Sequence, residues 1–263
     1  MAFLLSDRTI LVTGASAGIG AELARQLGER ASLLVLTSRS RERLESVAEE
    51  IPCETRVVPA DLSRPQGVVE LLGAISDLEV EVLVNNAGVG IGGRFPEAEE
   101  ERLCRMVELN VRSLLRLTRA LLPGMIERRE GAILNVGSIS GDQGVPHMAA
   151  YAATKAFVNN LTEGLAWELR GSGVRVCLLT PGSTSTEFFD RAGIDEERMF
   201  QRRMQSPKAV AAAGIAALER GRLRRIPGAL NRVLHLCQRH LPRPLVGRVI
   251  RRLFRDIGRP VQG

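Results

Sequence analysis

TILVTGASAGIG, residues 9–20, is the stretch that decides the fold of this chain. It begins with a short apolar run, turns through Gly14, Gly18 and Gly20, and continues into a helical pattern that extends to Arg30. A strand, a glycine turn and a helix in this order can hold a phosphate, because glycines let the backbone approach a pyrophosphate and the helix N-terminus stabilises its charge. Taken alone, the same pattern also fits a tight strand-to-helix connection without a ligand.

Short apolar strands alternate with helical segments along the chain, which predicts a parallel sheet with helices on both faces. The predicted strands are residues 9–13, 32–37, 56–59, 80–84, 131–137, 173–179 and 223–226. The predicted helices are residues 18–30, 41–50, 65–76, 99–127, 149–170 and 207–219. We therefore expect an α/β fold, with a single doubly wound Rossmann-type domain and a seven-stranded sheet over residues 1–228, and a helical extension over residues 229–263.

Tyr151 is the only tyrosine of the chain and stands four residues before Lys155, one of only two lysines. On a helix, positions four residues apart share a face, so an ammonium group would lie beside the phenol. A nearby positive charge favours the phenolate and lowers the pKa of a tyrosine from about 10. The pair is therefore predicted to exchange a proton near neutral pH, although a packed tyrosine on a surface helix has the same spacing.

Several motifs in order make residues 6–228 resemble the short-chain dehydrogenase/reductases. They are the glycine loop at 13–20, Asn85-Asn86-Ala87-Gly88 after the fourth strand, the ordered set Asn110, Ser138, Tyr151 and Lys155, and Pro181-Gly182 followed by Thr186. The resemblance implies hydride transfer between a nicotinamide cofactor and a small-molecule substrate that carries a carbonyl or an alcohol group.

The resemblance also implies a role for each of four catalytic residues. Tyr151 exchanges a proton with the reacting oxygen, to which Ser138 donates a hydrogen bond. Lys155 lowers the pKa of Tyr151 and binds the ribose of the nicotinamide, and Asn110 holds a water that relays protons from Lys155. Taken alone, Asn110 also fits a buried asparagine that is bonded to the local backbone.

The residues that would bind the dinucleotide are likewise assigned by the resemblance. They are Gly14, Ser16, Gly18, Ile19, Gly20, Ser38, Arg39, Asp61, Leu62, Asn86, Ala87, Gly88, Pro181, Gly182 and Thr186, together with Tyr151 and Lys155. Asp61 would accept a hydrogen bond from the adenine amino group. Residues 183–206, which carry Phe188, Phe189, Met199 and Phe200 among charges, stand where the family has a lid over the substrate.

The end of the second strand predicts a preference for NADP(H) over NAD(H). Enzymes that prefer NAD usually place an acidic residue about 20 residues after the glycine loop, where it binds the ribose 2′-hydroxyl. Here Ser38 stands at that position and Arg39 follows it. A guanidinium binds a 2′-phosphate that a carboxylate would repel. Arg41 and Arg43 are interpreted as part of a solvated, basic helix start.

Composition and charge narrow the class of protein. The net charge is +6, and residues 229–263 alone contain eight arginines and one aspartate. No segment has the roughly 18 apolar residues of a membrane-spanning helix, and residues 1–20 do not fit a signal peptide. Cys53, Cys104, Cys177 and Cys237 are far apart and are interpreted as reduced packing residues. A cytoplasmic protein without a metal is expected.

Residues 229–263 are predicted to form a basic, amphipathic helical extension. Pro242 and Pro244 separate two helical patterns, and the second has an apolar face made of Leu245, Val246, Val249, Ile250, Leu253, Phe254 and Ile257. This face would pack on the body or on a second subunit of a homodimer or homotetramer, or it would contact a membrane surface peripherally. Nucleic acid is not an expected partner, because no aromatic platform or known motif accompanies the charge.

The function predicted from the residues is an NADP-dependent carbonyl reductase or alcohol dehydrogenase. Apolar residues flank the expected site, which favours a hydrophobic ketone or acyl-type substrate; they are Val89, Ile91, Val145, Met148, Phe188 and Phe189. Residues 137–141 read G-S-x-S-G and do not fit the G-x-S-x-G register of a hydrolase nucleophile. The remaining alternative is a non-catalytic module that senses NADP, but such proteins tend to lose the tyrosine or the lysine.

Overall fold

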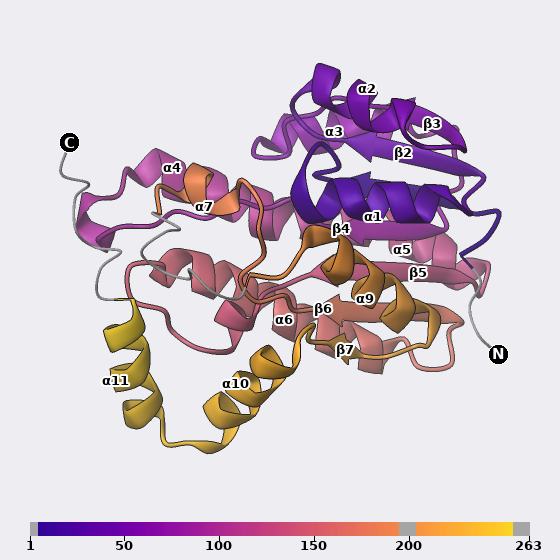
Figure 1. Cartoon of the computed structure of the whole chain (residues 1–263). Helices are drawn as coiled ribbons and strands as arrows, with labels where there is room; N and C mark the ends of the chain where they lie inside the picture. Colours follow the sequence, from indigo (N-terminus) through magenta and orange to yellow (C-terminus); the bar gives the residue numbers. More distant parts are fainter. Residues whose placement is uncertain (1–4, 195–203, 255–263) are drawn as a thin grey trace.

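The computed structural model describes residues 5–194 and 204–254, which form an α/β fold built on one parallel sheet (Figure 1). Within these residues, the strands are hydrogen-bonded in the order β3-β2-β1-β4-β5-β6-β7. They are β1 (Thr9–Thr13), β2 (Leu33–Thr37), β3 (Glu54–Val57), β4 (Val82–Asn85), β5 (Gly131–Val136), β6 (Val174–Leu179) and β7 (Arg224–Arg225). Each neighbouring pair is parallel, so the predicted seven-stranded sheet is confirmed.

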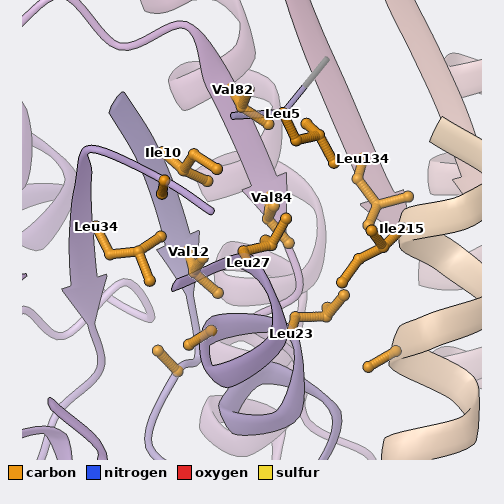
Figure 2. Packing of buried hydrophobic residues seen from close by; sticks show 14 of the residues in the cluster. Leu5, Ile10, Val12, Leu23, Leu27, Leu34, Val82, Val84, Leu134 and Ile215 are labelled. Atoms are coloured by element: carbon orange, nitrogen blue, oxygen red, sulfur yellow. The ribbon is translucent and has the colours of Figure 1, made fainter. Parts of the chain in front are cut away.

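Helices cover both faces of the sheet, because alternate residues of each buried strand point to opposite sides. One face is covered by α1 (Gly18–Gly28), α2 (Arg41–Glu49) and α9 (Pro207–Glu219), and the other by α3 (Pro65–Ala74), α5 (Leu114–Glu127) and α6 (Ala149–Glu168). Figure 2 shows the first of the two cores, in which strand residues Ile10, Val12, Leu34, Val82, Val84 and Leu134 meet Leu23 and Leu27 of α1 and Ile215 of α9. The sheet is thereby held rigid between two apolar layers.

The strand order reverses between β1 and β4. From β1, the chain continues outward through β2 and β3, and from β4 it continues in the opposite direction through β5, β6 and β7. In doubly wound sheets, the crevice at the carboxyl ends of the strands beside such a switch point is where ligands bind. The glycine loop leaves β1 at this edge, and Ser138 follows β5 at the same edge.

The predicted elements are present with ends shifted by a few residues, except for the single helix over 99–127. That segment is α4 (Glu100–Val107) and α5, joined by a π-helical stretch, η2 (Glu108–Ser113). A π-helical turn inserts an extra residue into the helix and so changes the direction of the side chains that follow. Asn110 lies within this stretch and is buried.

Two helices end the described part of the chain, α10 (Ala229–His240) and α11 (Arg243–Leu253). Pro242 is the N-cap of α11 and Pro244 lies in its first turn, so the predicted break between the helices is confirmed. Figure 1 shows α10 and α11 as a V-shaped pair beside the sheet. We call residues 229–253 the C-terminal hairpin.

Candidate active site

The glycine loop between β1 and α1 has a shape that requires glycine at three positions. Gly14 and Gly18 have left-handed backbone conformations, with φ of +66° and +56°. At Gly20, a Cβ atom would lie 2.1 Å from the carbonyl oxygen of Gly14 and 2.3 Å from the side-chain nitrogen of Asn86. Any side chain at Gly20 would therefore fill the cradle between the loop and the end of β4.

The N-terminus of α1 is suited to an anion. Its N-cap residue is Ala17, no side chain caps the first turn, and that turn contains no acidic residue. The first backbone N–H groups of the helix therefore retain their positive potential for a phosphate. Thr13 ties the loop to the end of β4, because its hydroxyl oxygen accepts hydrogen bonds from the N–H groups of Asn86 and Ala87, each at 3.0 Å. This cradle fits the pyrophosphate of a dinucleotide.

The ends of β2 and β3 continue the cavity that starts at the loop. Ser38 and Arg39 follow β2, Asp61 and Leu62 follow β3, and all four line the cavity. The Arg39 side chain is exposed and makes no ion pair with the part of the chain that the structure describes. A guanidinium in this state is available to a phosphate.

Arg41 and Arg43 have different surroundings, although the sequence analysis treated them alike. Arg41 pairs with Glu45 of its own helix, with 3.2 Å between the guanidinium and carboxylate atoms. Arg43 lines the cavity and pairs at 2.9 Å with Glu187, which lies just before α7 (Phe188–Ala192). Arg43 is exposed, as its interpretation as a solvated side chain implies, and its ion pair also connects α2 to the segment that leads into α7.

Ser138 and Tyr151 meet at the carboxyl end of β5. Ser138 is the N-cap of η3 (Ile139–Asp142), where its hydroxyl oxygen accepts a hydrogen bond from the Ser140 N–H at 3.1 Å. Tyr151 lies in the first turn of α6, and its phenol is hydrogen-bonded to the Ser138 side chain. Burial raises the pKa of Tyr151 to about 12, and the hydrogen bond with Ser138 acts in the opposite direction. The phenol is therefore protonated throughout the neutral range.

Lys155 behaves differently from its prediction. Its ammonium group donates a hydrogen bond to the carbonyl oxygen of Val136 at 2.8 Å. Burial lowers the pKa of Lys155 to about 8. The prediction that Lys155 lowers the pKa of Tyr151 is wrong for the chain by itself, because removal from water dominates the phenol and raises its pKa.

Asn110 holds the backbone behind the site. Its amide oxygen accepts a hydrogen bond from the Val89 N–H, and its amide nitrogen donates one to the Val89 carbonyl oxygen, both at 2.9 Å. The same nitrogen donates to the Thr154 hydroxyl at 3.0 Å. Asn110 thereby joins the chain after β4 to α6, one residue from Lys155. The alternative of a bond to the local backbone is wrong in one respect, because the backbone partner, Val89, is 21 positions away. The predicted role of Asn110 in holding a relay water stays a prediction.

One cavity of about 1480 Å³ brings these groups together. All the predicted dinucleotide-binding residues line it, namely Gly14, Ser16, Gly18, Ile19, Gly20, Ser38, Arg39, Asp61, Leu62, Asn86, Ala87, Gly88, Tyr151, Lys155, Pro181, Gly182 and Thr186. Ser138 lines it as well, whereas Asn110 lies behind its wall. The Phe188 ring lies beside the Tyr151 ring, with 5.2 Å between their centroids. Residues 195–203 of the predicted lid, including Met199 and Phe200, lie outside the described residues.

Comparison with known proteins identifies the family. The model of the short chain dehydrogenase family matches residues 8–197. The chain belongs to the short-chain dehydrogenase family. An uncharacterised oxidoreductase of Staphylococcus saprophyticus is 34% identical over 223 residues, which are 82% of this chain and 92% of that protein. The chain is therefore an NAD(P)-dependent dehydrogenase or reductase.

Solved structures of short-chain dehydrogenases match nearly the whole chain. A short-chain dehydrogenase from Sphingobium yanoikuyae in complex with NADPH has a TM-score of 0.80 and 32% identity, covering 97% of this chain and 98% of that one. A bulky-bulky ketone specific alcohol dehydrogenase from Comamonas testosteroni has a TM-score of 0.73 and 28% identity, covering 97% and 96%. Because each alignment covers 97% of this chain, it includes most of the C-terminal hairpin.

A polar network that the sequence analysis missed supports Ser138 in this dehydrogenase. The buried Asn159 amide nitrogen donates hydrogen bonds to the Ser138 carbonyl oxygen at 3.0 Å and to the Asp142 carboxylate at 3.1 Å. Asp142 also pairs with Arg224 at 2.5 Å and with His235 of α10 at 2.8 Å. The only local signal was the pair of glycines at 137 and 141, where a Cβ atom would lie 2.1 and 2.6 Å from the Asn159 side chain.

The apolar face of α11 is turned toward the body of the dehydrogenase. Ile250 is buried, and Val246 and Phe254 pack with it against the cluster that contains Met106, Met148 and Tyr151. The predicted packing on the body is confirmed for these three residues, whereas Leu245 and Val249 of the same predicted face are exposed. Membrane contact by this face has no support here. Ile257 lies outside the described residues.

Three further observations concern metal ligands, membrane-spanning helices and cysteines in the described part of the chain. No cluster of histidine, cysteine and acidic residues there could hold a metal ion. None of the described helices combines the length and the apolar character needed to cross a bilayer. The four cysteines are free thiols, and burial raises the pKa of Cys177 to about 12, which makes it an unreactive packing residue. The interpretation as packing residues is wrong for Cys104 and Cys237, because both are exposed.

Proposed function

We propose that the protein is an NADP-preferring oxidoreductase that transfers a hydride between the nicotinamide and the carbonyl or secondary alcohol group of a hydrophobic ketone or acyl-type substrate. The observation that carries this proposal is the joining of a phenol, a hydroxyl and an amine, on Tyr151, Ser138 and Lys155, to a glycine cradle in one cavity. The bound nicotinamide would supply the hydride in reduction and accept it in oxidation.

Tyr151 would donate its proton to the carbonyl oxygen in reduction and take one from the alcohol in oxidation. Its pKa of about 12 keeps the phenol protonated, which supports the role of proton donor in the chain as described. The Ser138 hydroxyl, held by the N–H of Ser140 and bonded to Tyr151, would donate a hydrogen bond to the oxygen on which negative charge develops.

Lys155 would bind the ribose hydroxyls of the cofactor and restore the proton of Tyr151. Its pKa of about 8 lies close to neutrality, so the amine can give up and regain a proton at low free-energy cost. Asn110 would hold a relay water next to Lys155, and its bonds to Val89 support a fixed orientation of its side chain.

The preference for NADP rests on charge. Arg39 is exposed at the edge of the cavity beside Ser38, and no carboxylate occupies the position after β2 where the 2′-hydroxyl of NAD would be bound. Arg43 lines the same region, but its guanidinium is paired with the Glu187 carboxylate. Asp61 would accept a hydrogen bond from the adenine amino group.

Apolar lining supports the substrate class. Val145, Met148 and Phe189 are buried around the catalytic phenol, and the Phe188 ring lies against it with the two ring planes tilted by 52°. We assign residues 183–206 to a lid over this pocket. The similarity to a bulky-bulky ketone specific alcohol dehydrogenase from Comamonas testosteroni supports a ketone of this kind.

Replacement of the phenol tests the proposal against the alternative of an NADP-sensing module. Tyr151→Phe is expected to bind NADPH as tightly as the wild type and to lose turnover by a factor of about 10²–10⁴. NADPH fluorescence titration measures the binding, and NADPH absorbance in the presence of a ketone panel measures the turnover. The proposed mechanism is wrong if the wild-type protein binds NADPH but reduces none of the ketones in the panel. It is also wrong if Tyr151→Phe keeps near-normal turnover.

A further inference from the structure

The C-terminal hairpin concentrates exposed apolar side chains. Among the described residues, half of the fourteen exposed large apolar side chains lie on this short segment, namely Leu230, Val233, Leu234, Leu236, Leu241, Leu245 and Val249. Single exposed apolar residues are ordinary, but a contiguous patch marks a place where another apolar surface binds.

Most of these side chains face the active-site cavity. Leu230, Leu234, Leu241, Leu245 and Val249 line the same cavity as Tyr151 and Ser138, whereas Val233 and Leu236 do not line it. The hairpin is also anchored so that this orientation is maintained. At α10, His235 contacts Asp142 and the Asn231 amide donates to the Pro227 carbonyl oxygen, while α11 inserts Ile250 into the core beside the phenol.

The cavity is larger than one ligand needs. Ligand pockets are usually about 300–1,000 Å³, and this one has about 1480 Å³. The dinucleotide-binding features line the part of the cavity next to α1, β2 and β3, and the hairpin lines a wall of its own. That wall carries five half-exposed aliphatic side chains and, among the described residues, no charged group that lines the cavity. The apolar side chains of this wall are exposed to the solvent-filled cavity, and covering them with apolar atoms of a ligand would be favourable.

We propose that the hairpin wall is a subsite for a large apolar substituent of the substrate, which completes this core when it binds. The inference rests on the proposed function and deepens it, because it selects substrates with a bulky aliphatic or ring-containing body over small ketones. Binding would cover Leu234 and Leu245 with apolar atoms, and the discrimination between large and small ketones would come from this contact.

Matched variants on the hairpin test the proposal. Leu234→Gln and Leu245→Gln change the wall, and Leu236→Gln is the control, since it alters an exposed leucine of α10 that does not line the cavity. Dicyclohexyl ketone and acetone serve as the large and small probes with NADPH. Each wall variant is expected to lower the ratio of kcat/KM for the large over the small ketone by about tenfold. Leu236→Gln is expected to leave the ratio unchanged.

A binding measurement separates this inference from the proposed function. Calorimetric titration of dicyclohexyl ketone into the Tyr151→Phe protein with NADPH reports occupation of the wall without turnover, and Leu234→Gln in that background is expected to weaken binding about tenfold. Loss of all turnover in the wild type with binding retained would overturn the proposed function alone. The wall proposal would be overturned if acetone were reduced as efficiently as the large ketone, or if Leu236→Gln and Leu234→Gln had equal effects.

Discussion

The buried ammonium group of Lys155 is predicted to lower the stability of the folded protein. Lys155→Met should therefore give a protein that is more stable and inactive. Burial lowers the pKa of Lys155 from 10.5 to about 8. A pKa change of this size corresponds to about 3 kcal/mol of penalty for the charged form at neutral pH. Methionine has a similar shape and no charge, but its thioether cannot donate to the Val136 carbonyl, and loss of that hydrogen bond costs about 1 kcal/mol. The net gain expected is about 2 kcal/mol.

The stability difference between Lys155→Met and the wild type is expected to depend on pH, in a direction that the lowered pKa of Lys155 determines. Between the folded pKa of about 8 and the ordinary value of 10.5, the unfolded chain binds a proton that the folded chain has released. Folding stability due to this group therefore rises with pH across that window, and the full penalty applies below it. The advantage of Lys155→Met over the wild type should shrink by about 1 kcal/mol between about pH 7 and about pH 9.

Urea denaturation of both proteins at the two pH values, followed by circular dichroism without cofactor, measures these differences. Buried groups such as the Cys177 thiol, whose pKa is raised, are common to both proteins and cancel. The control is Lys208→Met, since Lys208 is the only other lysine of the chain and is exposed. If Lys155→Met is less stable than the wild type at both pH values, or if the difference between them is independent of pH, then Lys155 does not carry the burial penalty described here.

Three further outcomes are expected. Arg39→Ala should weaken NADPH binding by about 1.5–3 kcal/mol and NADH binding much less, as measured by fluorescence titration, whereas Arg41→Ala should change neither. Gly20→Ala should abolish binding of both cofactors in the same assay, because its Cβ atom would lie 2.1 Å from a backbone oxygen. Asp142→Asn should lower the free energy of unfolding by about 1–3 kcal/mol and reduce turnover, since Arg224 would lose a charged partner and the support of Ser138 would weaken.

The fold was predictable because its signals are local. A buried parallel strand is a short apolar run, and the loop after β1 needs glycine at 14 and 18 because the backbone there has a positive φ. The helix over 99–127 was predicted as one piece, since its periodicity continues through Asn110, and a π-helical stretch leaves no strong compositional mark. In this stretch, the Asn110 side chain is turned inward and bonded to the Val89 backbone, and this orientation depends on tertiary contacts.

The composition of the site was also predictable, but its electrostatics were not. Spacing placed Tyr151 and Lys155 on one helix face, and the structure retains this arrangement. Spacing carries no information on burial, however, and burial is the first cause of the pKa change at both residues. The charge of Lys155 predicts a lowered pKa for Tyr151, whereas burial, the largest cause, raises that pKa in the chain by itself.

Contacts between residues far apart in the chain explain the remaining misses. Arg43 and Glu187 are separated by 144 positions, and Asp142 and His235 by 93, so no window of sequence contains either pair. Both pairs join one side of the cavity to a segment that follows β6, where α7 and the C-terminal hairpin lie. The parallel sheet fixes the cofactor cradle from its strand ends, and the later segments are attached to that cradle by side-chain pairs. The glycine loop of the cofactor cradle is thus recognisable from local sequence, whereas the shape of the substrate pocket depends on these long-range attachments.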